Sequence, residues 1–201
     1  AQKKNKLALV GQLTRDSMDG NLPLQEALTR KMKIIAPSYT DMRELGRAYC
    51  NSLVEGCAET IGALQKMGKN VYIITGNFQP AVGIVAEKLG IPQSHVFSNT
   101  LIFDKKGNYK GFNSKHPLAH NGGKVEIIQK YFRNKYGIVF VGDGATDLET
   151  KRVVDLFIGF GGVVEREIVK KNADIFIASK SISPLLSILS ETVSYKTGMI
   201  K

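Results

Sequence analysis

From residue 57 onward, short apolar runs of strand length alternate with segments of helix length, and this alternation constrains the fold more than any other feature. The clearest runs are residues 71–74 and 138–141, and each is followed within two residues by a glycine and then by a helical pattern. Wholly apolar strands are typical of a parallel sheet whose two faces are both covered by helices. The sequence therefore predicts an α/β fold, with a Rossmann-like, mainly parallel sheet sandwiched by helices. In such sheets ligands bind at the carboxyl ends of the strands.

The first 56 residues show helical patterns and no strand. A turn at Met18–Asn21 interrupts them, and Pro23 suits the first turn of the next helix. No internal repeat stands out. We predict a small, mostly helical cap at residues 1–56 and a Rossmann-like core at residues 57–201.

Composition excludes several classes of protein. The chain has 201 residues, of which 43% are hydrophobic, enough for a core that needs no disulfides. Cys50 and Cys57 lack the spacing of a metal site and indicate a reducing compartment. The apolar part of Lys3–Val10 is too short for a signal peptide, and no apolar run approaches the roughly 18 residues of a membrane-spanning helix. We expect a cytoplasmic protein.

The formal net charge of +10 suits nucleic acid, an anionic membrane surface or small anionic ligands. The lysines are scattered, and neither an aromatic platform for single strands nor a helix-turn-helix pattern accompanies them. We therefore expect no nucleic acid, and we also expect no membrane, but the charge alone does not identify the partner. Homodimerisation stays open.

Two carboxylates, Asp143 and Asp147, lie where the run 138–141 turns through Gly142 and Gly144 into a helix. A carboxylate at the rim of a sheet is a good ligand for Mg²⁺, which prefers oxygen donors. The same residues could instead cap the helix. This pattern alone leaves both interpretations open.

Two further features favour a phosphoryl-transfer site. Thr75 and Gly76 follow an apolar run, so a hydroxyl and backbone amides could hold a phosphate oxygen there. Lys124 follows two glycines at the start of a helix and could neutralise the phosphate. This is not a P-loop, because Leu118 stands where its first glycine is required and Val125 replaces the Ser/Thr. The glycine pairs at 142/144 and 159/161 do not complete a dinucleotide fingerprint either, which disfavours an NAD enzyme.

Four blocks together resemble the phosphoserine phosphatases of the haloacid-dehalogenase-like hydrolase superfamily: residues 73–78, 122–124, 141–147 and 158–162. The resemblance extends from about residue 11 to about residue 189 and includes segments 14–20 and 26–29, which are similar to the family's helical cap. It implies hydrolysis of O-phosphoserine to serine, the last step of serine biosynthesis. An aspartate would form an aspartyl-phosphate that water hydrolyses, with Mg²⁺ as cofactor.

The resemblance also implies roles for individual residues. Lys124, Thr75 and Asp147 would be catalytic, and Asp143 would ligate Mg²⁺. The substrate-binding residues would be Thr75, Gly76, Met18, Gly20, Lys31, Thr146 and Arg166.

The chain departs from the family at two places. Lys31 stands where relatives have an arginine against the substrate carboxylate, and lysine binds a carboxylate as a point charge rather than as a bidentate fork. The second departure is larger, because the nucleophile block Asp-x-Asp-x-Thr/Ser does not occur in the sequence. In the family this block ends a central strand between the strands equivalent to 71–74 and 138–141. We expect both neighbours to lack a partner and the sequence to be an incomplete record of the protein.

Other interpretations of the sequence stay open. The substrate could be another small phosphomonoester, because of Lys31. The central strand could come from another chain, or the chain could be a catalytically inactive binding protein.

Overall fold

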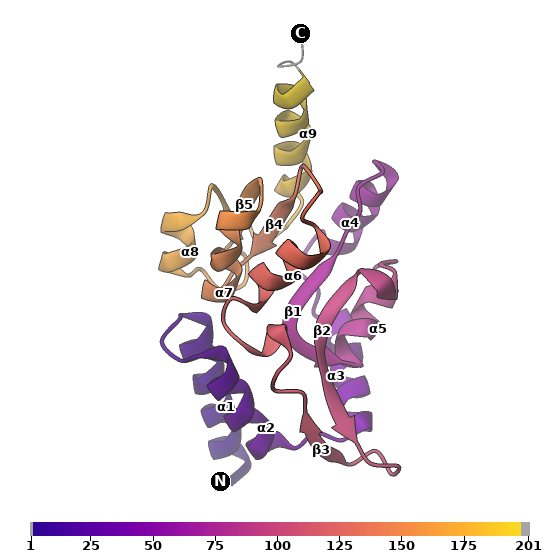
Figure 1. Ribbon diagram of the computed structural model, residues 1–201, viewed down its shortest axis with the longest axis vertical. Coiled ribbons are helices and arrows are strands. Elements are labelled where there is room, and N and C mark those ends of the chain that lie inside the picture. Colours follow the sequence, from indigo (N-terminus) through magenta and orange to yellow (C-terminus); the bar gives the residue numbers. More distant parts are fainter. Residues whose placement is uncertain (1, 198–201) are drawn as a thin grey trace.

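The computed structural model describes residues 2–197 (Figure 1). The α-helices are α1 (Gln2–Met18), α2 (Leu24–Ile35), α3 (Tyr39–Asn51), α4 (Cys57–Lys66), α5 (Ala81–Lys88), α6 (Gly123–Tyr131), α7 (Ala145–Leu148), α8 (Glu167–Asn172) and α9 (Pro184–Thr197). The 3-10 helices are η1 (Gln93–His95), η2 (Pro117–Ala119) and η3 (Glu149–Val153). The strands are β1 (Ile73–Gln79), β2 (Val96–Phe103), β3 (Tyr109–Phe112), β4 (Val139–Gly142), β5 (Leu156–Phe160) and β6 (Ile175–Ile177).

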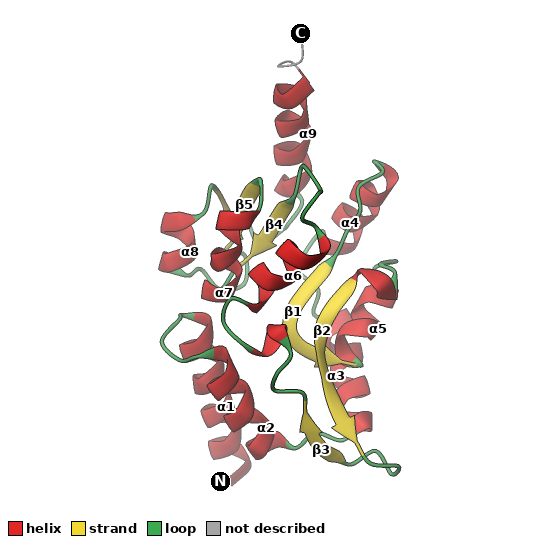
Figure 2. Ribbon diagram, in the orientation of Figure 1, coloured by secondary structure: helices red, strands yellow, loops and turns green. Residues whose placement is uncertain are grey.

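The strands form two sheets of three strands each (Figure 2). In the first sheet β1 is parallel to β2, and β3 returns antiparallel to β2 after a turn that contains Gly107. In the second sheet β4, β5 and β6 are all parallel, in that order. The mixed α/β class with a mainly parallel arrangement, expected from the sequence, is confirmed.

Strands β1 and β4 each pair on one side only, as expected for the neighbours of an absent central strand. The burial of the second sheet agrees with this arrangement. All four residues of β4 are half-buried, whereas Phe157, Ile158 and Gly159 of β5, which has a partner on both sides, are buried. Helix α6 contacts β1 of the first sheet and η3, which follows β4 and α7, and so connects the two halves.

Each sheet has its own hydrophobic cluster. The first joins α2 and α3 to the first sheet, with Leu28, Met42 and Phe78 among its buried members. The second joins α4 and α9 to the second sheet. The helices of the N-terminal part therefore share a core with β1 and β2, and the domain division at residue 56 stays a prediction.

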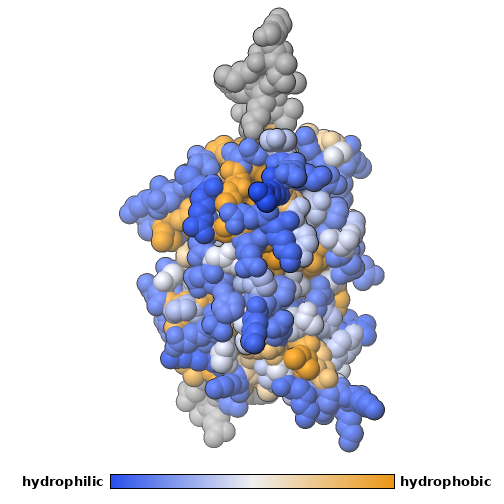
Figure 3. Space-filling view, viewed as in Figure 1, coloured by the Kyte–Doolittle hydropathy of each residue, from blue (hydrophilic) through white to orange (hydrophobic). Residues whose placement is uncertain are grey.

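One face of the molecule is mainly hydrophilic (Figure 3). On the face shown in Figure 3, hydrophilic side chains predominate and hydrophobic ones lie in scattered groups. None of the helices among residues 2–197 is long and apolar enough to cross a membrane.

Two elements differ from their expected bounds. Strand β1 begins at Ile73 and continues to Gln79, because a bulge between Ile74 and Phe78 shifts the register and lets Phe78 pair with β2 again. Helix α6 ends at Tyr131, although its helical pattern continues to residue 136. The ring of Phe132 packs edge-on against Tyr72 at 4.7 Å, so a tertiary contact competes with the local pattern.

Phe157 of β5 provides a test of the packing of the second sheet. Its side chain is completely buried, so Phe157→Ala should lower the free energy of unfolding by about 3–5 kcal/mol through lost burial and a residual cavity. Urea denaturation measures the change. The control Val163→Ala, at a residue that is 71% exposed, should stay within about 0.5 kcal/mol. Equal effects of the two substitutions would contradict the packing described for this sheet.

Candidate functional site

The turn between β4 and α7 carries the two carboxylates singled out in the sequence. Asp147 is buried, and its Oδ2 accepts the backbone N–H groups of Gly144 at 3.0 Å and of Asp143 at 3.3 Å. Its Oδ1 accepts a hydrogen bond from Nζ of Lys124. A Cβ at Gly142 would lie only 2.2 Å from Cβ of Asp147, so a glycine is required there. The interpretation of Asp147 as a helix-capping residue is therefore correct, and the same carboxylate also accepts a hydrogen bond from Lys124.

Asp143 makes different contacts. Its Oδ2 accepts a hydrogen bond from Nη1 of Arg166 at 2.6 Å, and the same nitrogen donates to the Asp143 carbonyl at 3.1 Å. The Asp143 side chain is 40% exposed, whereas that of Arg166 is only 10% exposed. Burial and the nearby Asp147 raise the pKa of Asp143, and Arg166 opposes this rise. The carboxylate thus lies at the rim of the sheet with part of its surface available.

Arg166 also contacts the N-terminal helices. Its Nε donates to Oδ1 of Asp19 at 3.1 Å, and Asp19 belongs to the turn between α1 and α2. One guanidinium therefore links that turn to the turn after β4.

The α1–α2 turn lies directly on the β4–α7 turn. A Cβ at Gly144 would come within 2.8 Å of the Met18 methyl carbon, and one at Gly20 would lie 3.4 Å from Cβ of Ala145. Gly20 has a φ of +84°, a conformation that side chains rarely adopt. Met18 and Gly20 thus cover the acidic turn from one side.

Lys124 is positioned by a glycine loop. Gly122 has a φ of +76°, and a Cβ at Gly123 would lie 1.8 Å from the Pro117 carbonyl oxygen, so both positions need glycine. The N–H of Gly122 donates to Oε2 of Glu149 at 2.5 Å. The Lys124 side chain is 12% exposed, and its ammonium is directed to Asp147.

Thr75 lies in the bulge of β1, where its Oγ1 accepts the N–H of Asn77 at 3.1 Å. Gly76 allows a close approach of two loops, because a Cβ there would lie 3.2 Å from the Leu118 carbonyl oxygen. The expectation that Thr75 directly precedes a helix is wrong, since the strand continues to Gln79 and α5 begins at Ala81.

Lys31 lies on α2, apart from the contacts described above. Its Nζ donates to Oγ1 of Thr14 at 3.3 Å, and it forms no ion pair with any residue that the structure describes. Burial lowers the pKa of Lys31.

The structure thus brings together Lys124, Asp147, Asp143, Arg166 and Met18, with Thr146 buried beside them. Among the described residues, the side-chain hydrogen bonds of Lys31 and Thr75 go to Thr14 and Asn77, which lie outside this group.

Sequence reasoning missed Asp19 and Glu149. Asp19 follows Met18 in a turn that the sequence marks, so its position was a usable signal. The sequence around Glu149 gives no such signal, because its carboxylate accepts a hydrogen bond from Gly122, which is 27 residues away.

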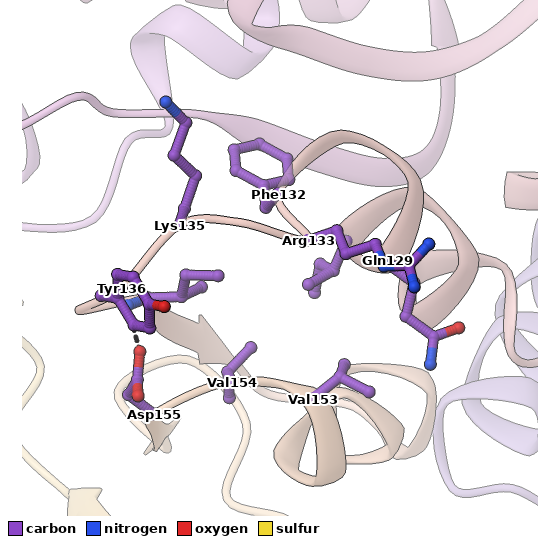
Figure 4. A pocket seen from close by; sticks show the side chains of 10 residues that line it. Gln129, Phe132, Arg133, Lys135, Tyr136, Val153, Val154 and Asp155 are labelled. Carbon is purple, nitrogen blue, oxygen red and sulfur yellow. Dashed lines mark hydrogen bonds between the residues drawn. The ribbon is translucent and has the colours of Figure 1, made fainter.

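Within residues 2–197, no group of three or more His, Cys, Asp or Glu side chains is arranged to hold a metal. A hollow of ≈ 660 Å³ lies between α6 and the start of β4 (Figure 4). Phe132, Tyr136, Ile138 and Val154 are among its lining residues. Ile138 precedes β4 and Asp143 follows it, so this hollow and the acidic turn lie at opposite ends of the strand.

Comparisons with known proteins agree with the geometry. The family model of haloacid dehalogenase-like hydrolases matches residues 6–154. The phosphoserine phosphatase of Mus musculus is 40% identical over 173 residues, which are 85% of this chain and 76% of that protein. The phosphoserine phosphatase of Bos taurus is 41% identical over 171 residues, which are 84% and 76% of the two chains.

A solved structure gives the same result for the fold. A substrate-bound phosphoserine phosphatase superposes with a TM-score of 0.74 at 28% identity, covering 89% of this chain and 83% of that chain. The chain belongs to the haloacid dehalogenase-like hydrolase family.

Proposed function

We propose that this protein hydrolyses O-phosphoserine to serine and phosphate, as part of serine biosynthesis in the cytoplasm. The observation that carries the proposal is the buried Lys124–Asp147 pair beside the half-exposed Asp143 at the carboxyl end of β4. The relatives at about 40% identity are named phosphoserine phosphatases, which supports the choice of substrate.

In the proposed site, several groups bind the phosphate. The hydroxyl of Thr75 and the amide of Gly76 bind phosphate oxygens, and the Lys124 ammonium neutralises their charge. Such fixed donors stabilise the charge of a transferring phosphoryl group without reorganising during the reaction. Asp147 holds the ammonium in place, and Thr146 lies beside the phosphate.

The site also fits Mg²⁺ in part. Mg²⁺ is usually held by one or two carboxylates together with waters and substrate phosphate, and Asp143 offers a half-exposed carboxylate at the rim. When bound, the ion would supply charge neutralisation between nucleophile and phosphate. Arg166 would have to release the Asp143 Oδ2 that it now holds.

A nucleophile is the remaining requirement. Neither β1 nor β4 contains an acidic residue, and each has one unpaired edge. We infer that, in the active enzyme, a strand parallel to both lies between them and ends in an aspartate near Asp143. This carboxylate attacks phosphorus and the serine oxygen leaves with a proton. Water then cleaves the aspartyl-phosphate, which releases phosphate and restores the carboxylate.

Substrate recognition falls to the residues around the α1–α2 turn. Lys31 would bind the substrate carboxylate, Met18 and Gly20 would line the pocket for the serine part, and Arg166 would contact the substrate. Because lysine gives a point charge, a second candidate is another small phosphomonoester.

The first prediction concerns the reaction. The protein with the nucleophile strand in place should release phosphate from phosphoserine faster than from phosphoglycolate, phosphoethanolamine or glycerol phosphate. Excess EDTA should abolish the release, and replacing the nucleophilic aspartate by asparagine serves as the control. Equal rates across the panel would reject the substrate, and no release from any ester would favour a binding protein.

The second prediction concerns Lys124. Lys124→Met should lower kcat/KM for phosphoserine by about 100- to 1000-fold, because it removes a preorganised charge and leaves Asp147 buried without its partner. Steady-state kinetics measure the change. The control Lys170→Met, which removes a surface pair with Glu165 and a contact with the Phe176 ring, should leave kcat/KM unchanged. A Lys124→Met enzyme of normal activity would remove the lysine from the mechanism.

The third prediction concerns pH and Lys31. Burial lowers the pKa of Lys31 from 10.5, so its positive charge is present below the lowered pKa and is lost as the pH rises through it. The KM for phosphoserine should therefore increase at alkaline pH. Lys31→Arg should lower KM and remove this increase, because the guanidinium stays charged and binds a carboxylate through two hydrogen bonds. A KM with the same alkaline rise in both proteins would assign the titration to another group.

A further inference from the structure

Asn99 on β2 is a buried polar residue that none of the steps above uses. It is 1% exposed and lies opposite Phe78 in the register of β1 and β2. Its Nδ2 donates two hydrogen bonds to backbone carbonyls, to Gly76 at 2.9 Å and to Leu118 at 3.0 Å. The two carbonyls belong to the bulge of β1 and to η2, two segments (the two loops) that are 42 residues apart in sequence, so the amide joins distant parts of the chain.

Each loop carries one of the proposed phosphate-binding groups. Gly76 follows Thr75 directly. Leu118 belongs to η2, and the backbone of η2 packs on the loop before Lys124, since a Cβ at Gly123 would lie 1.8 Å from the Pro117 carbonyl oxygen. The Asn99 amide therefore contacts the backbone directly after Thr75, and it contacts η2, which packs on the glycine before Lys124.

The chemistry of the contact requires a side chain with two donors. The backbones of Gly76 and Leu118 approach so closely that a Cβ at Gly76 would lie 3.2 Å from the Leu118 oxygen. An amide nitrogen has two N–H groups and can serve both carbonyls, whereas a carboxylate has none and a hydroxyl has one.

The other end of the amide gives independent support. Oδ1 of Asn99 is buried and has no hydrogen-bond partner among the described residues. A buried acceptor without a partner costs about 1–3 kcal/mol. The fold bears this cost at a position where the two donors of Nδ2 hold the two loops together.

We propose that Asn99 is a positioning residue for phosphoryl transfer, whose amide sets the separation between the Thr75–Gly76 turn and the loop of Lys124. It acts through these two loops and does not touch the substrate. The inference rests on the proposed function for its catalytic meaning, and on the hydrogen bonds alone for its effect on phosphate binding.

The test compares Asn99→Asp and Asn99→Ser in the catalytically active protein. Aspartate keeps the shape of the side chain but places an oxygen, which accepts and does not donate, against the two carbonyls. Serine keeps one donor. The matched control is Asn172→Asp at the exposed end of α8, which also loses a bond from Nδ2 to a carbonyl, at 2.7 Å, but belongs to neither loop. The readouts are kcat and KM for phosphoserine, the affinity for inorganic phosphate by calorimetry, and Tm.

Asn99→Asp should weaken phosphate binding and lower kcat/KM by about 10- to 100-fold, because displacements on the order of 1 Å have effects of this size. Asn99→Ser should fall between this variant and the wild type, and Asn172→Asp should match the wild type. Affinity is measured below the Tm of each variant, so a merely structural role would lower Tm and leave the affinity unchanged. That result, or a failure of both variants to fold, would overturn the proposal.

The proposed function can fail separately. If the wild type binds inorganic phosphate but does not hydrolyse phosphoserine, the choice of reaction is wrong, and the phosphate affinities of the variants still decide the role of Asn99. If the wild type does not bind phosphate, both inferences are overturned.

Discussion

The rest of the site depends on the carboxylate of Asp147. One oxygen accepts two backbone amides at the start of α7, and the other accepts the ammonium of Lys124. Lys124 begins α6, which contacts β1, while Asp147 follows β4, so this buried ion pair joins the two half-sheets through polar contacts. Removing either partner would leave a charge buried without compensation. The same pair therefore contributes to the connection between the halves and fixes the cation of the proposed reaction.

The unpaired edges of β1 and β4 explain why the connection depends on α6. Sheet hydrogen bonds hold neighbouring strands of a parallel fold together, but among the described strands β1 pairs only with β2 and β4 pairs only with β5. Each half also has its own hydrophobic cluster. A strand between the halves would add a ladder on both of its sides and place its carboxyl end beside the Lys124–Asp147 pair. The position that completes the sheet is thus also the position that a nucleophile needs.

The sequence predicted those parts of the site whose residues are marked by local chemistry. Asp143 and Lys124 each follow a glycine that a turn requires, Asp147 lies three residues after Gly144, and apolar runs identify the strands before the acids. Asp147 also shows that one carboxylate can accept backbone amides at a helix start and hold a lysine at the same time. The continuation of β1 through Thr75 and Gly76 was missed, because a bulge depends on the partner strand. Asn99 and Glu149 were missed because their partners belong to loops that only the fold brings close.

The positive charges of the site are almost all compensated before any substrate binds. Arg166 is held by Asp19 and Asp143, and Lys124 is held by Asp147. Such pairing reduces the cost of keeping cations in surroundings where their side chains are only 10% and 12% exposed. Of the cations assigned to substrate binding, Lys31 alone has no acidic partner within the described part of the chain. In the proposed reaction, a substrate carboxylate that binds Lys31 would displace no internal acid, so this contact would cost less electrostatic energy than one with Arg166 or Lys124.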